Sequence, residues 1–224
     1  MTPQRYQKLR RVLDNRQPDL TVLLDDVHKP HNFSAILRSC DAVGVLQAHA
    51  VWTDRTLRPN HLTSGGTSKW VRIRTHADIE SAATELHAGG FQLVAAHPDG
   101  GALDYRDIDY TRPTALVLGA ELHGLGQAAL AFADTRVRVP MMGMVESLNV
   151  SVAAATILFE AQRQRSNANL YAECRLDRAL YDNTLFEWAH PAVAGYCQRH
   201  ALAYPALDDD GEIIGPVTRS DHPL

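Results

Sequence analysis

The sequence has few cysteines: Cys40, Cys174 and Cys197 lie far apart in a chain of 224 residues. They form neither a CxxC pair nor an even set, so we expect no disulfide framework and no structural zinc site. Isolated cysteines of this kind are typical of reduced thiols, which persist in the cytoplasm. We therefore expect a cytoplasmic protein with no metal ion in its functional site.

Long apolar runs are also missing. The most apolar stretch, residues 150–161, is too short to cross a bilayer, and the charged N-terminus lacks the apolar segment of a signal peptide. The motifs GxSxG and HExxH and the P-loop lysine motif are absent, which excludes the common hydrolase, zinc-protease and phosphate-loop templates. A composition of 45% hydrophobic and 21% charged residues excludes a disordered chain and predicts a globular one.

A large net charge is lacking too, because the formal value is only −4, but the charges are segregated along the chain. Acidic residues gather in residues 204–224, whereas basic residues gather in the first 16 residues and directly after the apolar run. Two basic groups favour a polyanionic partner such as a nucleic acid, although solvated helix faces would give the same pattern. The basic residues concerned are Arg5, Lys8, Arg10, Arg11, Arg16, Arg163 and Arg165.

The hydrophobic periodicity predicts strands that alternate with helices. Strands are expected at residues 20–24, 45–52, 70–73, 91–96, 114–118 and 136–139. Helices are expected at residues 3–16, from Asn32 as N-cap to Val43, at 79–87, 127–133, 147–163 and within 176–200. This alternation indicates an α/β fold with a mostly parallel sheet and helices on both faces, in which ligands bind at the carboxyl ends of the strands. Residues 204–224, rich in Pro, Gly and Asp, are expected to be loose.

Three polar segments stand out, and each has a plain structural explanation. Asn32 can cap a helix on which Arg38 and Asp41 form a surface pair. The glycine-rich residues 119–126 follow a buried strand but match no GxGxxG pattern, and a simple turn would explain them. Ser147 and Asn149 both sit at the start of the longest helix, where a single cap would suffice.

Taken together, the three segments resemble the three motifs of the TrmH family in the SPOUT superfamily of RNA methyltransferases. The matching stretches are NFSAILRSCDAVGV from Asn32, LVLGAELHG from Leu116 and VPMMGMVESLNVSVAAATILFEAQRQR from Val139. The resemblance runs from Arg5 to about Tyr171, and the flanking RQPDLTVLL and HKPHN resemble the tRNA guanosine-2'-O-methyltransferase branch.

The resemblance implies a fold, a reaction and partners. Members of this branch transfer the methyl group of S-adenosylmethionine to the ribose 2'-hydroxyl of guanosine 18 in the tRNA D-loop, as homodimers in which each cleft is completed by the neighbouring subunit. It implies a basic N-terminal helical extension (1–17), a methyltransferase domain (18–165) and a C-terminal helical extension with an acidic tail (166–224). It also implies a trefoil knot in the C-terminal part of the domain, which general topological rules would not predict.

The resemblance also implies site residues. Arg38 matches the catalytic arginine and Asn32 the residue that positions it, while Glu121, Ser147 and Asn149 match positions that hold the active-site loops or the target nucleotide. The implied cofactor-binding residues are Ala96, Gly119, Val139, Met141, Ser147 and Leu148. The implied RNA contacts are Arg5, Lys8, Arg16, His31, Arg163 and Arg165.

Chemistry and alternatives qualify this assignment. Because a guanidinium is essentially always protonated, we expect Arg38 to stabilise the developing 2'-oxyanion rather than act as a base. Glu146, where close family members carry glutamine, adds a negative charge beside the site. The apolar helix from Leu148 to Phe159 suits either a dimer interface or the core. The alternative functions are ribose methylation of ribosomal RNA and a non-catalytic RNA-binding protein.

Overall fold

The computed structural model describes residues 1–52, 69–120 and 124–215. Its chain forms two compact units: a helical unit, Met1–Arg16 with Glu173–Leu224, and a sheet unit, Gln17–Ala172. The boundaries predicted after residues 17 and 165 stay predictions, and the contacts add that the two terminal segments associate with each other. No helix within the described ranges is long and apolar enough to cross a membrane.

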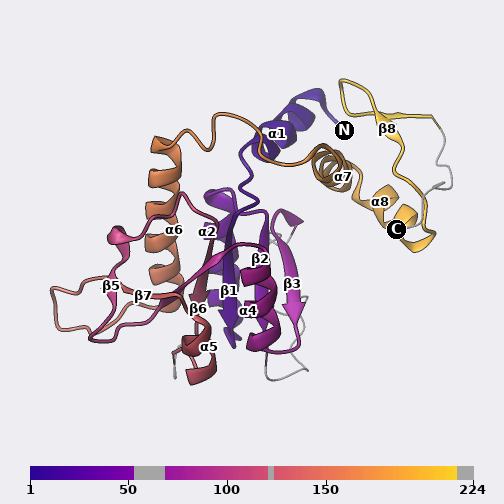
Figure 1. Ribbon diagram of the computed structural model, residues 1–224. Coiled ribbons are helices and arrows are strands. Elements are labelled where there is room, and N and C mark those ends of the chain that lie inside the picture. The colour runs from indigo at the N-terminus through magenta and orange to yellow at the C-terminus, as the bar shows by residue number, and fades with distance from the viewer. Residues whose placement is uncertain (53–68, 121–123, 216–224) are drawn as a thin grey trace. The chain divides into compact units, whose positions relative to one another are not determined.

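The sheet unit contains a seven-stranded sheet in the order β3-β2-β1-β6-β4-β7-β5, and all pairings between these strands are parallel (Figure 1). The predicted parallel α/β architecture is therefore confirmed. β5, only two residues long, was not predicted. The strands are β1 (Leu20–Asp25), β2 (Gln47–Val51), β3 (Arg72–His76), β4 (Gln92–Ala96), β5 (Leu103–Asp104), β6 (Thr114–Leu118) and β7 (Thr135–Arg138).

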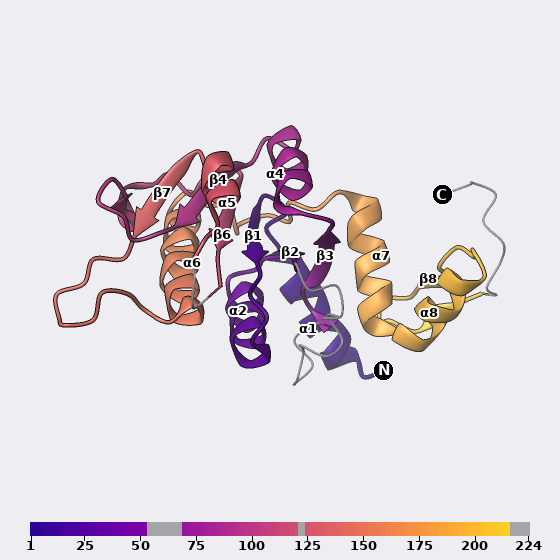
Figure 2. The ribbon, with the colours of Figure 1, turned by 90° about the horizontal axis from the view of Figure 1, so that it is seen from below.

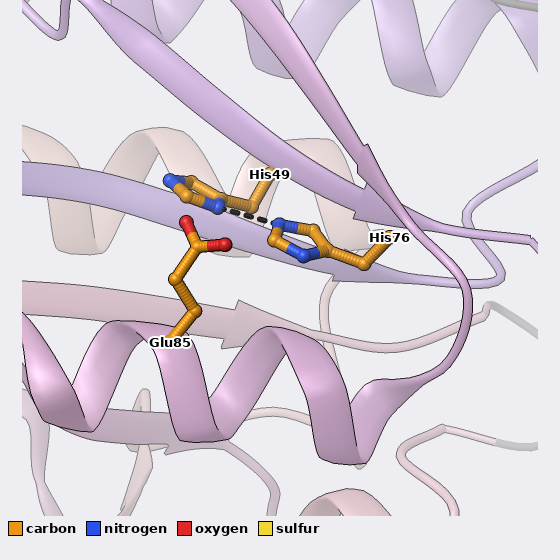
Figure 3. Close-up of side chains that lie close together, drawn as sticks. All are labelled: His49, His76 and Glu85. Atoms are coloured by element: carbon orange, nitrogen blue, oxygen red, sulfur yellow. Dashed lines mark hydrogen bonds between the residues drawn. The ribbon is translucent and has the colours of Figure 1, made fainter.

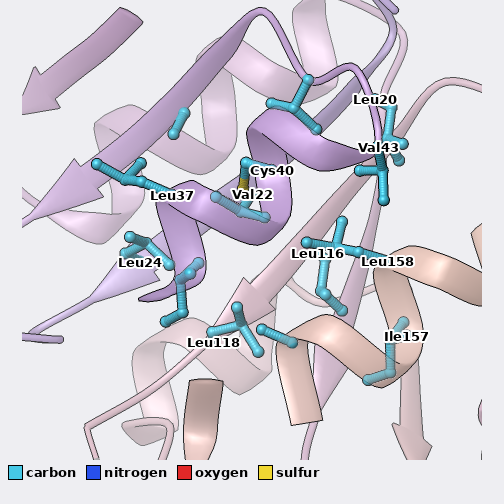
Figure 4. Close-up of a cluster of buried hydrophobic side chains, with 14 of the residues drawn as sticks. Leu20, Val22, Leu24, Leu37, Cys40, Val43, Leu116, Leu118, Ile157 and Leu158 are labelled. Atoms are coloured by element: carbon cyan, nitrogen blue, oxygen red, sulfur yellow. The ribbon is translucent and has the colours of Figure 1, made fainter. Parts of the chain in front are cut away.

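Helices cover both faces of this sheet, as predicted (Figure 2). One face packs against α2 (Pro30–Ala42) and α6 (Val150–Asn167), and the other against α4 (Ile79–Ala88) and α5 (Gln127–Phe132). The short 3-10 helix η2 (Tyr105–Asp107) follows β5. Under α2 and α6, side chains from the central strands β1 and β6 meet both helices in the larger core (Figure 4). α6 contributes Ala154, Ile157, Leu158 and Ala161 to this core, whereas Val152 and Phe159 of the predicted apolar stripe are 49% and 50% exposed.

The start of α2 corrects one prediction. The N-cap is Lys29, and Pro30 occupies the first turn, where its fixed backbone angle suits a helix start. Asn32 therefore lies inside the first turn rather than at the cap, and it is buried, with 2% of its surface exposed. The side chain of Asn32 instead makes a contact with the start of α6, described below.

The helical unit consists of α1 (Pro3–Asp14), α7 (Arg178–Ala189), α8 (Pro191–Arg199) and a two-stranded antiparallel sheet of β8 (Ala206–Leu207) and β9 (Ile213–Ile214). The prediction of a loose tail is wrong for its described part. The hairpin turn at Gly211 packs on the ring of Tyr6 so closely that a Cβ there would lie 2.5 Å from it. The Met1 ammonium also bonds the Glu212 carboxylate at 2.8 Å. These contacts order a segment whose composition favours disorder.

Arg165 is the centre of a buried hydrogen-bond cluster in the sheet unit. Its side chain has no exposed surface, and its guanidinium donates five hydrogen bonds of 2.7–3.1 Å. The five N–H groups of the guanidinium are thus all used. The acceptors are the side-chain oxygens of Gln17 and Asp19 and the carbonyls of Asp19, Tyr110 and Arg112.

We predict that Arg165→Met lowers the free energy of unfolding by about 3–5 kcal/mol, because it removes five hydrogen bonds of a fully buried guanidinium and takes the ion-pair partner from the partly buried Asp19 carboxylate. Arg163→Met is the matched control, since Arg163 is exposed and pairs only with Glu160 one helical turn away. The control should cost much less, because exposed ion pairs contribute little to stability. Urea unfolding followed by circular dichroism measures both, and equal losses would show that the buried contacts add nothing.

Candidate functional site

A cleft of about 510 Å³ lies where three neighbouring strands, β6, β4 and β7, end. The strands are parallel, so their carboxyl ends meet at one edge of the sheet, the place where open α/β sheets bind ligands. The first residues of α6 and the segment before it complete the wall. Apolar side chains such as Val137 and Ile157 line it beside backbone groups and a few charged side chains, a mixture typical of small-molecule sites.

The loop after β6 contains a glycine that the geometry requires. A Cβ at Gly119 would lie 2.3 Å from the backbone of Gly124 and 2.5 Å from the nitrogen of Leu125. The two ends of this loop meet at the bridge between Ala120 and Gly124, and Gly124 has a positive φ of 64°. The described ends of this loop therefore approach each other closely, and Gly119 and Gly124 are part of the cleft wall.

Asp25, at the end of β1, holds the far side of the same loop. Burial, with a smaller contribution from the charge of Asp26, raises the pKa of Asp25 above its ordinary value, while the N–H of Gly126 bonds the carboxylate and lowers it. Gly126 is also the N-cap residue of α5. One carboxylate therefore ties the loop to the neighbouring strand.

Asn149 joins the first and third polar segments of the sequence. It is the N-cap of α6, and its side-chain oxygen accepts the backbone N–H of Ser151 at 2.9 Å and the Ser151 hydroxyl at 2.6 Å. Its amide nitrogen donates to the side-chain oxygen of Asn32 on α2 at 3.4 Å. Asn149, and not Ser147, is therefore the N-cap of α6. Its bond to Asn32 also links the starts of α6 and α2 beside the cleft.

Most of the predicted cofactor-binding residues line this one cleft. Ala96, Gly119, Val139, Ser147 and Leu148 are among its walls, and Asn149 joins them. Among the described residues of the cleft wall, Met141 and Arg38 are not found. Arg38 lies exposed on α2, further along the helix from Asn32. Glu121 lies outside the described residues.

The predicted RNA contacts divide into two groups. Arg5, Lys8, His31 and Arg163 are exposed, as a contact with RNA requires. Arg16 and Arg165 have no exposed surface, which corrects their assignment. The guanidinium of Arg16 lies over the ring of Trp188, 5.2 Å from its centre, and that of Arg165 is the buried hydrogen-bond centre described above. Sequence alone does not separate a buried arginine from an exposed one.

Several cleft residues escaped the sequence analysis. His97 and Pro98 directly follow β4, and Arg138 ends β7, so their place at strand ends could have indicated them. None of these three residues belongs to a pattern that signals a ligand by itself. Glu146, which the sequence predicts beside the site, also lines the cleft and is opposite in charge to Arg138.

Two family descriptions match the chain. The SpoU rRNA Methylase family matches residues 19–159, and the description "SpoU, rRNA methylase, C-terminal" matches residues 163–216. The first match covers both the sheet and the cleft, and the second begins near the end of α6.

Relatives and solved structures agree with these matches. A protein of Escherichia coli named tRNA (guanosine(18)-2'-O)-methyltransferase is 47% identical over 95% of this chain and 94% of its own. One of the same name from Thermus thermophilus is 54% identical over 84% and 96%. The crystal structure of a tRNA modifying enzyme described as TrmH/SpoU, from A. aeolicus, has a TM-score of 0.78 and 40% identity over 85% of this chain and 97% of its own. The methyltransferase AviRb from Streptomyces viridochromogenes, in complex with the cofactor AdoMet, has a TM-score of 0.59 and 30% identity over 69% and 62%.

Gly119→Ala should lower the free energy of unfolding by roughly 1–3 kcal/mol, because the added methyl group would overlap the backbone of the loop. Gly143→Ala is the control, since a Cβ there meets nothing within 4 Å. Urea unfolding midpoints measure the difference. A loss in the control as large as at Gly119 would contradict the tight return of the loop.

Proposed function

The chain belongs to the SpoU rRNA methylase family, and from this premise we propose that it is a tRNA (guanosine(18)-2'-O)-methyltransferase that uses S-adenosylmethionine. The observation that carries the proposal is the high identity to two proteins of that name over more than nine tenths of their own lengths. The cleft at the carboxyl edge of the sheet supports it, because transfer to an RNA requires a site for the methyl donor that opens to solvent.

The cleft suits the proposed cofactor. S-adenosylmethionine, when bound, supplies a methyl group on a positively charged sulfur. The backbone groups around Gly119 and Val139 and the apolar wall at Leu148 can hold an adenine ring between them. Arg138 and Glu146 offer charges for the carboxylate and ammonium of an amino-acid end. The chemistry of the wall therefore matches each part of the molecule.

We propose Arg38 as the group that acts on the ribose. Its guanidinium carries a permanent charge that can stabilise the 2'-oxygen as this oxygen gives its proton to water and bonds the methyl carbon, whose bond to the donor sulfur breaks and leaves that sulfur neutral. Asn32 lies earlier on the same helix and accepts a hydrogen bond from the side-chain amide of Asn149. This bond would fix the helix and thereby position Arg38. Glu121, Ser147 and Met141 are proposed as further residues of the site, which shape the loops around the reacting groups.

A second copy of the chain would complete the site, and we propose a homodimer. Arg38 is not found in the described wall of its own chain's cleft, so a neighbouring subunit offers a way to bring it there. The segment between β7 and α6 extends away from the sheet (Figure 2), and its Met142 and Met144 are 96% and 99% exposed. Phe159 on α6 is 50% exposed. Apolar side chains this exposed favour a protein contact.

The RNA would be held by exposed cations, of which Arg5 and Lys8 belong to α1. Contacts of this kind bind phosphates and make affinity fall steeply with salt. We also propose the SPOUT-type trefoil knot, which the likeness to solved SpoU structures supports, and a cytoplasmic location. The location follows from the proposed tRNA substrate and from cysteines that form no disulfide among the described residues.

Methyl transfer to unmodified tRNA is the direct test of the function. We predict transfer from radiolabelled S-adenosylmethionine to a tRNA with guanosine 18 and none to a matched tRNA with 2'-deoxyguanosine 18, because the second lacks only the nucleophilic hydroxyl. Scintillation counting of precipitated RNA measures both. Equal transfer would place the methyl group on another atom. Transfer to ribosomal RNA alone, or to no RNA, would support one of the alternative functions instead.

Arg38→Ala should lower the single-turnover rate about 100-fold or more, because the developing oxyanion loses its stabilising charge. Arg106→Ala is the control, since Arg106 is an exposed arginine of the same unit that pairs with Asp104. The control should keep the wild-type rate. In Arg38→Lys, a pH–rate profile of unchanged shape is expected from a charge-stabilising role. The loss of one limb of the profile would identify Arg38 as a base.

A further inference from the structure

A cluster of three metal-ligand side chains lies on the face of the sheet that α4 covers. His49 comes from β2, His76 from the end of β3 and Glu85 from α4, and one ligand atom of each lies within 4.8 Å of the others (Figure 3). Figure 3 shows the carboxylate of Glu85 directed towards the two imidazole rings. None of the three residues lines the cleft of the proposed methyl transfer.

Regular structure builds this cluster. In the parallel pairing of β2 and β3, His49 lies opposite Arg74 and Val51 opposite His76. Residues two apart on a strand share a face, so both imidazoles point to the same side of the sheet. Val51 packs in the core under α4 together with Ala82 and Leu86, which fixes that helix over the two histidines. The site is thus preorganised on two strands and a helix.

The two imidazoles meet nitrogen to nitrogen. Nδ1 of His49 lies 2.8 Å from Nε2 of His76, and the rings stack at 5.1 Å between their centres. Burial, with smaller contributions from His76 and Arg74, lowers the pKa of His49 to about 4. A neutral imidazole offers a lone pair. In the hydrogen bond between His49 Nδ1 and His76 Nε2, one proton lies between the two nitrogens. A metal ion that binds both nitrogens would replace this proton.

We propose that His49, His76 and Glu85 bind one divalent transition-metal ion, represented by Zn²⁺, through the two facing nitrogens and one carboxylate oxygen. Imidazole and carboxylate are ligands that Zn²⁺ accepts, whereas Ca²⁺ and Mg²⁺ prefer oxygen alone. Tetrahedral Zn–N bonds place the two nitrogens about 3.3 Å apart. His76 is half-buried at the end of its strand, so a small turn of this ring opens the 2.8 Å contact by that amount.

The residues around the cluster support the three ligands. Nε2 of His49 lies 3.2 Å from the amide nitrogen of Gln47. A flip of this amide would let its oxygen accept the Nε2 proton once Nδ1 binds metal. Arg74 bonds one oxygen of Glu85, which orients the carboxylate and leaves its second oxygen for the ion. The bound ion would connect β2, β3 and α4, so its effect is on stability and requires no RNA.

Titration calorimetry with ZnCl₂ on tag-free, chelator-treated protein tests the site. We expect one ion per wild-type chain and an affinity at least 10-fold lower in His76→Gln and in Glu85→Gln, each of which removes one ligand. His87→Gln is the matched control, because His87 lies on the same helix α4 but pairs with Asp134. The control should bind as the wild type does. Zn²⁺ should raise the melting temperature of the wild type and the control by several degrees.

Co²⁺ gives a readout on the wild-type protein that does not depend on how the variants fold. Visible absorption bands of low-coordinate cobalt, bleached by added Zn²⁺, are the expected result. The proposal is overturned if wild-type protein binds no stoichiometric Zn²⁺, if the cobalt bands are absent, or if folded His76→Gln and Glu85→Gln bind as tightly as wild type. These measurements need no methyl donor, so their outcome is independent of the proposed function.

Discussion

Arg165 places a permanent positive charge inside the sheet unit, and acceptors from residues before β1 and before β6 surround it. This contact fixes the end of α6 at the edge where the strands begin. α6 has 18 residues and is about 27 Å long, so it spans the sheet. Its first residue lies at the edge where the strands end, and its last turn lies at the edge where they begin. The same helix therefore carries Asn149 to the cleft, and the position of the site depends on an anchor at the opposite edge.

The cleft itself follows from the parallel sheet and one close backbone approach. Parallel strands bring Ala96, Leu118 and Arg138 to a common edge, and Gly119 lets the next loop fold back without a side chain in the way. Asn149 then links α6 to Asn32 on α2 across the packed helices. Segments that are remote in sequence thus meet at one site, because the strand ends, the Gly119 loop and the first turn of α6 all lie at the same edge of the sheet.

The sequence predicts what local patterns encode. The longer strands and the two-sided helix cover follow from hydrophobic periodicity, and five of the six residues that the family resemblance implies for the cofactor line the cleft. Partners remote in sequence are invisible to such patterns. Asn32 is predicted as a cap, and its local sequence does not reveal the bond that it makes with Asn149 at the start of another helix. Arg165 is predicted to be exposed, because its partner Asp19 lies 146 residues away in the sequence. The histidine cluster joins two strands and a helix and has no local signal.

The helical unit combines the first and last parts of the chain, and this has a consequence for biosynthesis. α1 is synthesised before the sheet unit, whereas α7 and the β8–β9 hairpin, whose turn packs on Tyr6, are synthesised after it. At about 5–20 residues per second, α1 waits on the order of ten seconds or more for them. A helix of 12 residues is marginal alone in water. The sheet unit can thus form before the basic helix is fixed, because that helix waits for α7 and the hairpin.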